Sequence, residues 1–170
     1  MSGKIVSLLI LIIALSVGAG VYYFQVYGWY DRVVLEDIEL TERDGNPVVI
    51  PATDISGIDA ISSPIRFRAC FTTTLTPDEV AARFTPYPEA EPLTGPGWFD
   101  CYDADAIGDA LVDGTMTAWL GTADITYGID RVIALDADGR GYVWHQINPC
   151  GEVVFDGKPA PEGCPPKPEN

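Results

Sequence analysis

The sequence predicts an α+β protein, in which an N-terminal transmembrane helix precedes one small domain with a mainly antiparallel sheet and two short helices. Three observations support this fold class. Ile5 to Val26 is a run of twenty-two residues without a charge, which suits a membrane span. Residues 65–72 alternate between apolar and polar side chains, as in a half-buried strand. Helix-start signals precede short apolar-periodic stretches after Thr76 and Asp103.

The apolar run ends in aromatic residues of the kind that gather at a membrane–water interface. Lys4 and the N-terminal amine are the positive charges before the run, and all carboxylates follow it. This asymmetry predicts a cytoplasmic segment at 1–4, a span at 5–26 and an exported domain at 27–170. The predicted interface aromatics are Tyr22, Tyr23, Tyr27, Trp29 and Tyr30.

A cleaved signal peptide is the alternative to an anchor, with Val17-Gly18-Ala19 as its small-residue site. Hydrophobicity continues to Val26, beyond an ordinary signal-peptide core of about 7 to 15 residues, and this favours an uncleaved anchor. The domain is exported in either case.

Two pairs of small residues four apart, Ala14 with Gly18 and Ser16 with Gly20, lie within the run. Such spacing lets a second transmembrane helix approach closely. The alternative is that these residues face lipid.

The chain is strongly acidic, with a formal net charge of −15 that becomes −16 once Lys4 is set aside. Nucleic acid is therefore not an expected partner. An acidic surface favours solubility, and it can also steer a basic protein or collect divalent cations. Membrane lipid and another membrane or periplasmic protein are the expected partners.

The four cysteines all follow the apolar run, and an even number in an exported domain indicates disulfides. Three pairings are possible, and we prefer Cys70 with Cys101 and Cys150 with Cys164, because the second would close a tail rich in Gly and Pro. A zinc site is the alternative, but Cys-x-x-Cys spacing is missing and His145 is the single histidine. No cofactor is expected.

The first half of the domain reads as a hairpin of strands at 35–41 and 48–51 with Asp44-Gly45 in its turn. The strand at 65–72 follows, and its Arg66 and Arg68 are expected to pair with carboxylates. Thr76, Pro77 and Glu79 then predict a capping box and a helix over 77–84.

Prolines and glycines keep residues 86–97 irregular and make them a candidate contact surface. A strand is predicted at 98–102, and a helix through residues 107–112, capped by Asp103 or Asp105, should end at Gly114. β-Branched and aromatic residues predict further strands, and an extended tail should follow. These strands are at 116–120, 130–135 and 141–148, and the tail is 157–170.

The densest group of carboxylates lies around the second helix, where calcium would relieve the repulsion between like charges. EF-hand spacing does not fit, because Ile107 and Gly114 occupy ligand positions, so a solvated acidic face is favoured. The calcium candidates are Asp100, Asp103, Asp105 and Asp109, with Asp113 on the same helix face as the last two. His145 is interpreted as a packed or surface strand histidine.

Four short stretches carry a resemblance to a known group of proteins: residues 27–30, 68–71, 100–103 and 148–151. With the anchor, they make the chain similar to an uncharacterised family of short, single-pass, membrane-anchored proteins from alphaproteobacteria. The resemblance implies a bacterial inner-membrane protein that faces the periplasm. It implies no activity and no site residues.

We find no catalytic motif, so the first functional hypothesis is non-enzymatic. It is an accessory subunit or assembly factor of a membrane complex, which presents an acidic periplasmic domain. The alternative is a periplasmic ligand- or calcium-binding module, or an enzyme without a recognisable motif. That alternative would require Asp100, Asp103, Asp105 or His145 to lie near a pocket.

Overall fold

The structure is a computed structural model that describes residues 3–167. Met1 and Ser2 of the predicted cytoplasmic segment, and residues 168–170 of the predicted tail, lie outside the described part. The chain divides into two units, residues 1–30 and 31–170, and each is described by itself.

The first unit is a long helix, α1 (Gly3–Tyr23), continued by the π-helical turn η1 (Phe24–Gly28). Together they are long and apolar enough to cross a membrane, a property shared by signal sequences near an N-terminus. Ala14, Ser16 and Gly18 are exposed along this helix, and Gly20 is partly buried. The aromatic rings at its end contact one another, and the rings of Tyr23 and Tyr27 are stacked with centroids 6.0 Å apart.

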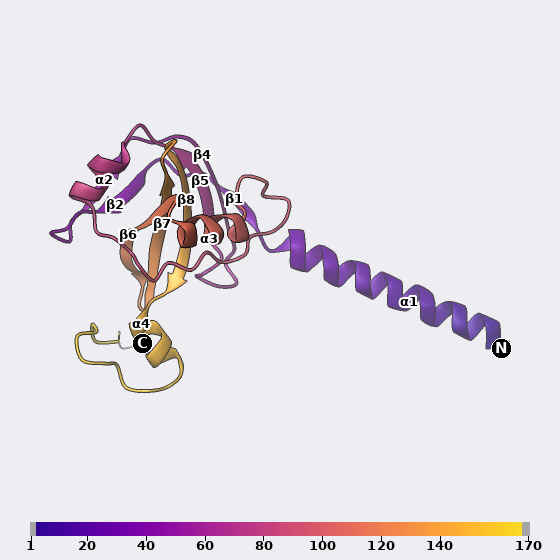
Figure 1. Ribbon diagram of the computed structural model, residues 1–170. Coiled ribbons are helices and arrows are strands. Elements are labelled where there is room, and N and C mark those ends of the chain that lie inside the picture. The colour runs from indigo at the N-terminus through magenta and orange to yellow at the C-terminus, as the bar shows by residue number, and fades with distance from the viewer. Residues whose placement is uncertain (1–2, 168–170) are drawn as a thin grey trace. The chain divides into compact units, whose positions relative to one another are not determined.

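The second unit contains the predicted, mainly antiparallel sheet (Figure 1). Six strands lie in the order β1-β4-β5-β8-β7-β6, and all their described pairings are antiparallel. A separate hairpin consists of β2 and β3. The strands are β1 (Asp31–Val33), β2 (Ile38–Thr41), β3 (Pro47–Ile50), β4 (Thr53–Asp59), β5 (Arg68–Thr72), β6 (Met116–Thr126), β7 (Ile129–Asp136) and β8 (Arg140–Ile147).

One face of the sheet, here the hairpin face, forms the main hydrophobic core. Register aligns Ala69, Val143, Ile133 and Trp119 across four strands of this face. The β2–β3 hairpin and α2 (Pro77–Arg83) cover them with buried apolar side chains. The covering residues are Ile38, Leu40, Ile50, Val80 and Phe84.

The helix α2 starts where the sequence predicts. The Thr76 hydroxyl oxygen accepts the Glu79 backbone N–H, and a Glu79 carboxylate oxygen accepts the Thr76 backbone N–H, which completes the capping box. Pro77 occupies the first turn, where its missing N–H has no cost. These local bonds place Val80 and Phe84 over the core.

The opposite face, here the loop face, is covered by residues 86–103 and by α3 (Ala104–Asp113). The disulfide between Cys70 and Cys101 fastens this cover to β5. Gln146 on β8 adds two hydrogen bonds, donating to the Glu89 carbonyl and accepting the Glu91 backbone N–H. The proline-rich segment is therefore held on the sheet, and Pro88, Glu89 and Glu91 in it are exposed.

Arg68 on β5 joins the sheet to the covering segment of the loop face. Its guanidinium is 3% exposed and donates to the backbone carbonyls of Leu93 and Thr94 in the covering segment. It also donates to two carbonyls next to β5, those of Ile65 and Phe67. The sequence predicts a carboxylate partner for Arg68. In the structure its guanidinium donates to four backbone carbonyls.

Several predicted elements are corrected by the structure. Residues 98–102 form turns rather than a strand, because Phe99 and Tyr102 donate backbone hydrogen bonds three residues back. β1 and β4 have no counterpart in the prediction, and neither does a third short helix of this unit, α4 (Pro149–Phe155). Asp103 caps α3 and Gly114 ends it at φ 79°, as expected.

Candidate binding groove

The hairpin face continues beyond its cover, and there it becomes the floor of a groove. Ile129 on β7 and Ile147 on β8 are register partners at the ends of their strands. They follow the same side of the sheet as the core residues Ile133 and Val143, since side chains alternate along each strand. Ile147 is half-buried, whereas Val143 is 1% exposed.

A polar pair separates this floor from the core. His145 and Arg131 are register partners one step inward from the floor, and Arg131 Nε donates to His145 Nε2 at 3.1 Å. His145 Nδ1 lies 2.8 Å from the Pro64 carbonyl oxygen, so a neutral imidazole that donates from Nδ1 satisfies both contacts. The imidazole also stacks on the Phe67 ring, with centroids 4.5 Å apart.

The pKa of His145 is lowered to about 4, chiefly because the imidazole is buried; the hydrogen bond to Pro64 opposes the shift, and the positive charges of Arg131 and Arg68 add to it. Burial also lowers the pKa of Arg131, against the opposing charges of Glu39 and Asp59. His145 is thus a packed strand histidine, as interpreted from the sequence.

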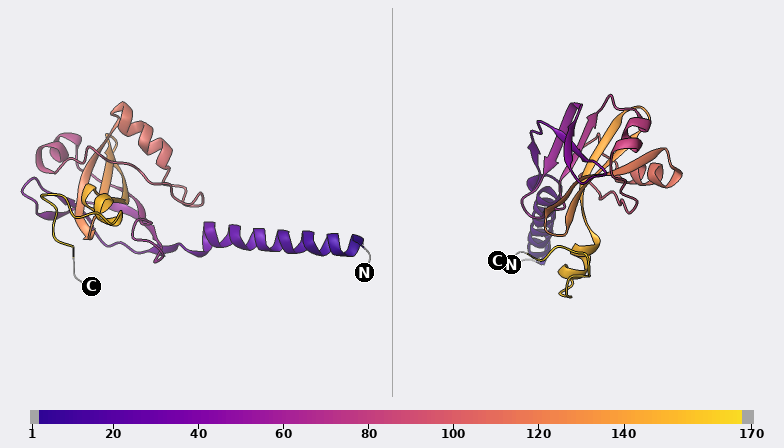
Figure 2. Two further views of the ribbon diagram at one scale, coloured as in Figure 1. Left: turned by 90° about the horizontal axis from the view of Figure 1, so that it is seen from below. Right: turned by 90° about the vertical axis from the view of Figure 1, so that its left-hand side faces the viewer.

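The helix α4 follows directly from β8, beyond the end of that strand (Figure 2). Its Phe155 lines the groove, so α4 forms one wall. It begins with Asn148 as N-cap and Pro149 in the first turn. Gly128 and Gly151 let the helix seat against the β6–β7 turn, because a Cβ on Gly128 would lie 2.5 Å from the Gly151 Cα. Gly128 also has φ +77°, which favours glycine.

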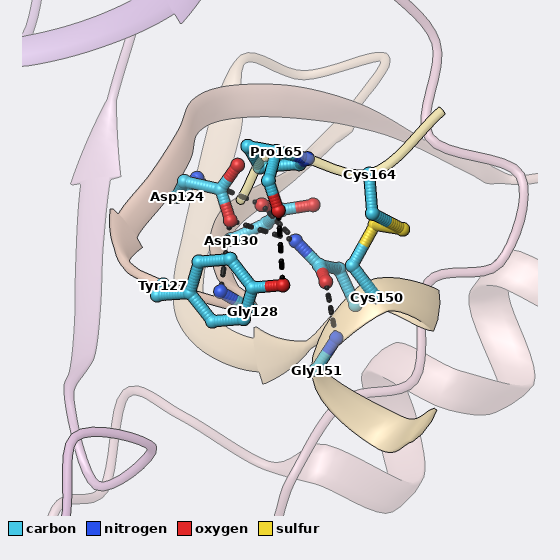
Figure 3. Close-up of a disulfide and its surroundings, with 9 residues drawn as sticks. Asp124, Tyr127, Gly128, Asp130, Cys150, Gly151, Cys164 and Pro165 are labelled. Atoms are coloured by element: carbon cyan, nitrogen blue, oxygen red, sulfur yellow. Dashed lines mark hydrogen bonds between the residues drawn. A yellow bond between two sulfur atoms is a disulfide. The ribbon is translucent and has the colours of Figure 1, made fainter. Parts of the chain in front are cut away.

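A network of hydrogen bonds ties α4 to the strands (Figure 3). The Asn148 side-chain amide donates to both Asp124 and Asp130, while its oxygen accepts the Gly151 backbone N–H at 2.9 Å. Asp124 accepts the Gly128 N–H at 2.8 Å, and Asp130 accepts the Asp124 N–H at 2.9 Å. Asp130 and Asn148 are each 7% exposed and have hydrogen-bond partners, whereas Asp124 is exposed, so the network leads from the interior to the surface.

The loop after α4 is fixed at two points (Figure 3). A disulfide joins Cys150 in α4 to Cys164, across a separation of 14 residues. The Tyr127 hydroxyl donates to the Pro165 carbonyl at 3.1 Å. The loop is therefore held against the β6–β7 turn, and both described disulfides have the pairing preferred from the sequence.

The groove enclosed by these elements has a volume of about 480 Å³. Its lining is mainly apolar and includes three hydroxyl groups and one ammonium group, a composition typical of a binding site. Phe155 is 50% exposed on its α4 wall. The lining residues are Ser63, Pro64, Ile65, Thr126, Tyr127, Ile129, Ile147, Phe155 and Lys167.

The predicted acidic group occupies a different place in the domain. Asp100, Asp103 and Asp105 line a polar pocket of about 360 Å³ between the proline-rich segment and α3. One carboxylate oxygen of Asp103 accepts the backbone N–H groups of Asp105 and Ala106, which is the capping role. Asp109 is exposed on α3. Among residues 3–167, no three His, Cys, Asp or Glu side chains converge as metal ligands.

The groove was not among the sites predicted from the sequence, and its parts come from four separate segments. The signal for α4 was present, since Asn-Pro at 148–149 is a typical helix start. No local pattern indicates that residues 63–65 lie beside Phe155, because that proximity depends on strand order.

Comparison with known proteins finds no match among curated proteins and none among solved structures. A family model does match, over residues 38–165, and its description is a family of unknown function (DUF6446). The match spans the hairpin, every strand of the sheet except β1, both disulfides and all of the groove-lining residues except Lys167. The chain therefore belongs to this family of unknown function, DUF6446.

Proposed function

We propose that this protein is a single-pass inner-membrane protein of a bacterium, and that its acidic domain, exposed to the periplasm, serves a membrane complex as an accessory subunit or assembly factor. In this proposal α1 stays in the membrane as an anchor, with the N-terminus in the cytoplasm. The groove is the surface through which the domain contacts its partner. Of the residues that line the groove, Lys167 alone lies outside the stretch matched by the family model.

The observation that carries the proposal is the uncovered end of the hairpin face. A core face is normally closed over its whole length, because exposed apolar area is unfavourable in water. Here the cover stops at His145, and Ile147 and Phe155 remain accessible in a concave site. The site has fixed walls, since a disulfide and a hydrogen-bond network hold α4 in place.

The location is supported by the two disulfides together with the apolar helix. Disulfides form and persist in oxidising compartments, and the periplasm is one of them. Alkylation of thiols at the moment of cell lysis tests this, and the expected result is that none of the four cysteines is labelled. A protease added to spheroplasts should digest the domain. Labelled cysteines, or a domain protected from the protease, would contradict the location.

The partner contact is tested by site-specific photo-crosslinking in cells. A photoreactive phenylalanine analogue replaces Phe155 in one strain and Val112 in another. Val112 is the matched control, because it is 91% exposed on α3, which covers the other face. We expect adducts with a distinct envelope protein from position 155 and not from position 112. Equal adducts from both positions, or none from position 155, would refute the assignment of the groove.

A further inference from the structure

The chemistry of the partner can be inferred from the groove and from the charge around it. The groove, at about 480 Å³, is roughly three times as large as an engineered apolar cavity of about 150 Å³ that accommodates benzene. It therefore has room for more than one apolar side chain. The half-buried Ile147 offers these side chains an aliphatic floor, with Ile129 beneath it at 2% exposed, and Phe155 offers an aromatic wall.

The wall that carries Phe155 is acidic. Glu152 is exposed and lies three residues before Phe155 on α4, so the two side chains are neighbours on the helix surface. Asp156 follows directly, and its carboxylate is 3.3 Å from the Lys158 ammonium. Lys167 is the basic residue of the lining. Glu152 is not a lining residue, but a cation that flanks a segment seated on Phe155 is one helix turn from its carboxylate.

The charge of the whole domain acts in the same direction. A net charge of −16 after Lys4 attracts a basic partner over distances longer than a side-chain contact. A second copy of the chain would bring the same charge and would be repelled. Electrostatic complementarity of this kind accelerates encounter and rejects partners of like charge.

We propose that the groove binds a segment of another envelope protein in which apolar side chains are flanked by Lys or Arg. The apolar side chains occupy the space between the isoleucine floor and Phe155, and a flanking cation pairs with Glu152. This proposal rests on the proposed function, because it names the partner chemistry of the same groove.

Selection from a random peptide library tests the proposal without presupposing a partner. The full chain is embedded in nanodiscs of zwitterionic lipid, and empty nanodiscs remove peptides that bind lipid. We expect enriched peptides to carry two or more apolar residues flanked by Lys or Arg. Enrichment of acidic or uncharged peptides, or no enrichment over empty nanodiscs, would overturn the proposal.

Two variants locate the binding of one enriched, fluorescently labelled peptide. Phe155→Ala should weaken binding by roughly tenfold, as loss of a central aromatic contact does. Glu152→Lys should weaken it more than Asp109→Lys, which makes the same change of net charge on α3. Equal effects of the two charge variants, or unchanged binding by Phe155→Ala, would show that the peptide does not occupy the groove in this way. Thermal melting of each variant confirms that it is folded.

The two proposals can fail separately. If crosslinks from position 155 reach an envelope protein through an acidic or uncharged segment, the proposed function stands and the inferred partner chemistry is wrong. If position 155 gives no crosslink above position 112, both are wrong. A crosslinked lipid instead of a protein would also overturn both.

Discussion

The two ends of the hairpin face are built from the same strands and differ in what lies on them. At the core end, Ile133 and Val143 are nearly inaccessible beneath the β2–β3 hairpin and α2. At the groove end, Ile147 is half-buried and Phe155 is half-exposed. The hydrogen-bonded pair of His145, which is buried, and Arg131, which is partly buried, divides the two ends.

This difference indicates separate roles for residues of similar chemistry. Apolar side chains at the core end contribute to the free energy of unfolding, because folding removes them from water. At the groove end, the strands and α4 are held by a disulfide and by polar contacts. The accessible apolar side chains there are available for binding.

Truncation at the core end should have the largest effect on stability. Phe84 is fully buried under the hairpin, and Phe84→Ala leaves a cavity among close-packed side chains. We expect a loss of about 3 to 5 kcal/mol in the free energy of unfolding. Denaturant titration of the full chain in detergent measures it, with Val112→Ala as the exposed control. A loss below about 1 kcal/mol would mean that this end is not the main core.

Removal of the disulfide at the groove end should have the next largest effect. Cys150→Ser with Cys164→Ser frees a loop of 14 residues, and the chain-entropy relation gives a cost of about 3 kcal/mol. Amide hydrogen exchange should increase in α4 and the following loop. Cys70→Ser with Cys101→Ser is the comparison, and it should increase exchange in residues 86–103 instead. Increased exchange in both regions from either pair would contradict the separate fastening of α4 and of the loop-face cover.

The polar pair between the two ends should make stability depend on pH. The pKa of His145 is about 4 in the folded protein and about 6.5 in the unfolded chain. Between these two pH values the unfolded chain therefore binds more protons than the folded protein. Stability is therefore fully present above pH 6.5 and falls as the pH decreases toward 4, by at most about 1.4 kcal/mol per unit.

The decrease can be assigned to one side chain, because His145 is the single histidine. Unfolding of the wild-type protein and of His145→Gln should be compared between pH 6.5 and 5. The wild type should lose up to about 2 kcal/mol over this range, and the variant should lose less. The same slope in both proteins would show that His145 is not kept neutral by the fold.

Truncation at the groove end should have the smallest effect on stability. Phe155→Ala removes a ring that is already half in water, so we expect a loss below about 1 kcal/mol. A loss similar to that of Phe84→Ala, measured by the same denaturant titration, would place Phe155 in the core instead.

Local sequence signals predicted the class of fold and many of its elements. The capping box at Thr76, the N-cap at Asp103 and the glycine at 114 each act within one turn of chain, and the structure has helix ends at all three. The missed strands, β1 and β4, lack strict alternation, and β4 contains an irregularity between Thr53 and Ser56. Periodicity is a weak guide to such segments.

Long-range contacts account for what the sequence did not predict. Arg68 donates hydrogen bonds to the carbonyls of Leu93 and Thr94, which lie 25 and 26 positions further along the chain, and no local pattern indicates these contacts. The turns at 98–102 are set by the disulfide of Cys101 and by the packing of Tyr102 beneath Arg68, and they override the strand preference of the aromatic residues. The groove needs the order of the strands, which the sequence leaves open.

The most direct test of the central claim measures partner capture and stability in the same protein. A photo-crosslinker placed at position 65, which also lines the groove, is used with and without Phe155→Ala. Our account predicts that the substitution removes most of the adduct while the melting temperature stays within a few degrees. An adduct that persists, or an adduct that disappears only because the protein unfolds, would contradict the claim that this end of the sheet serves binding.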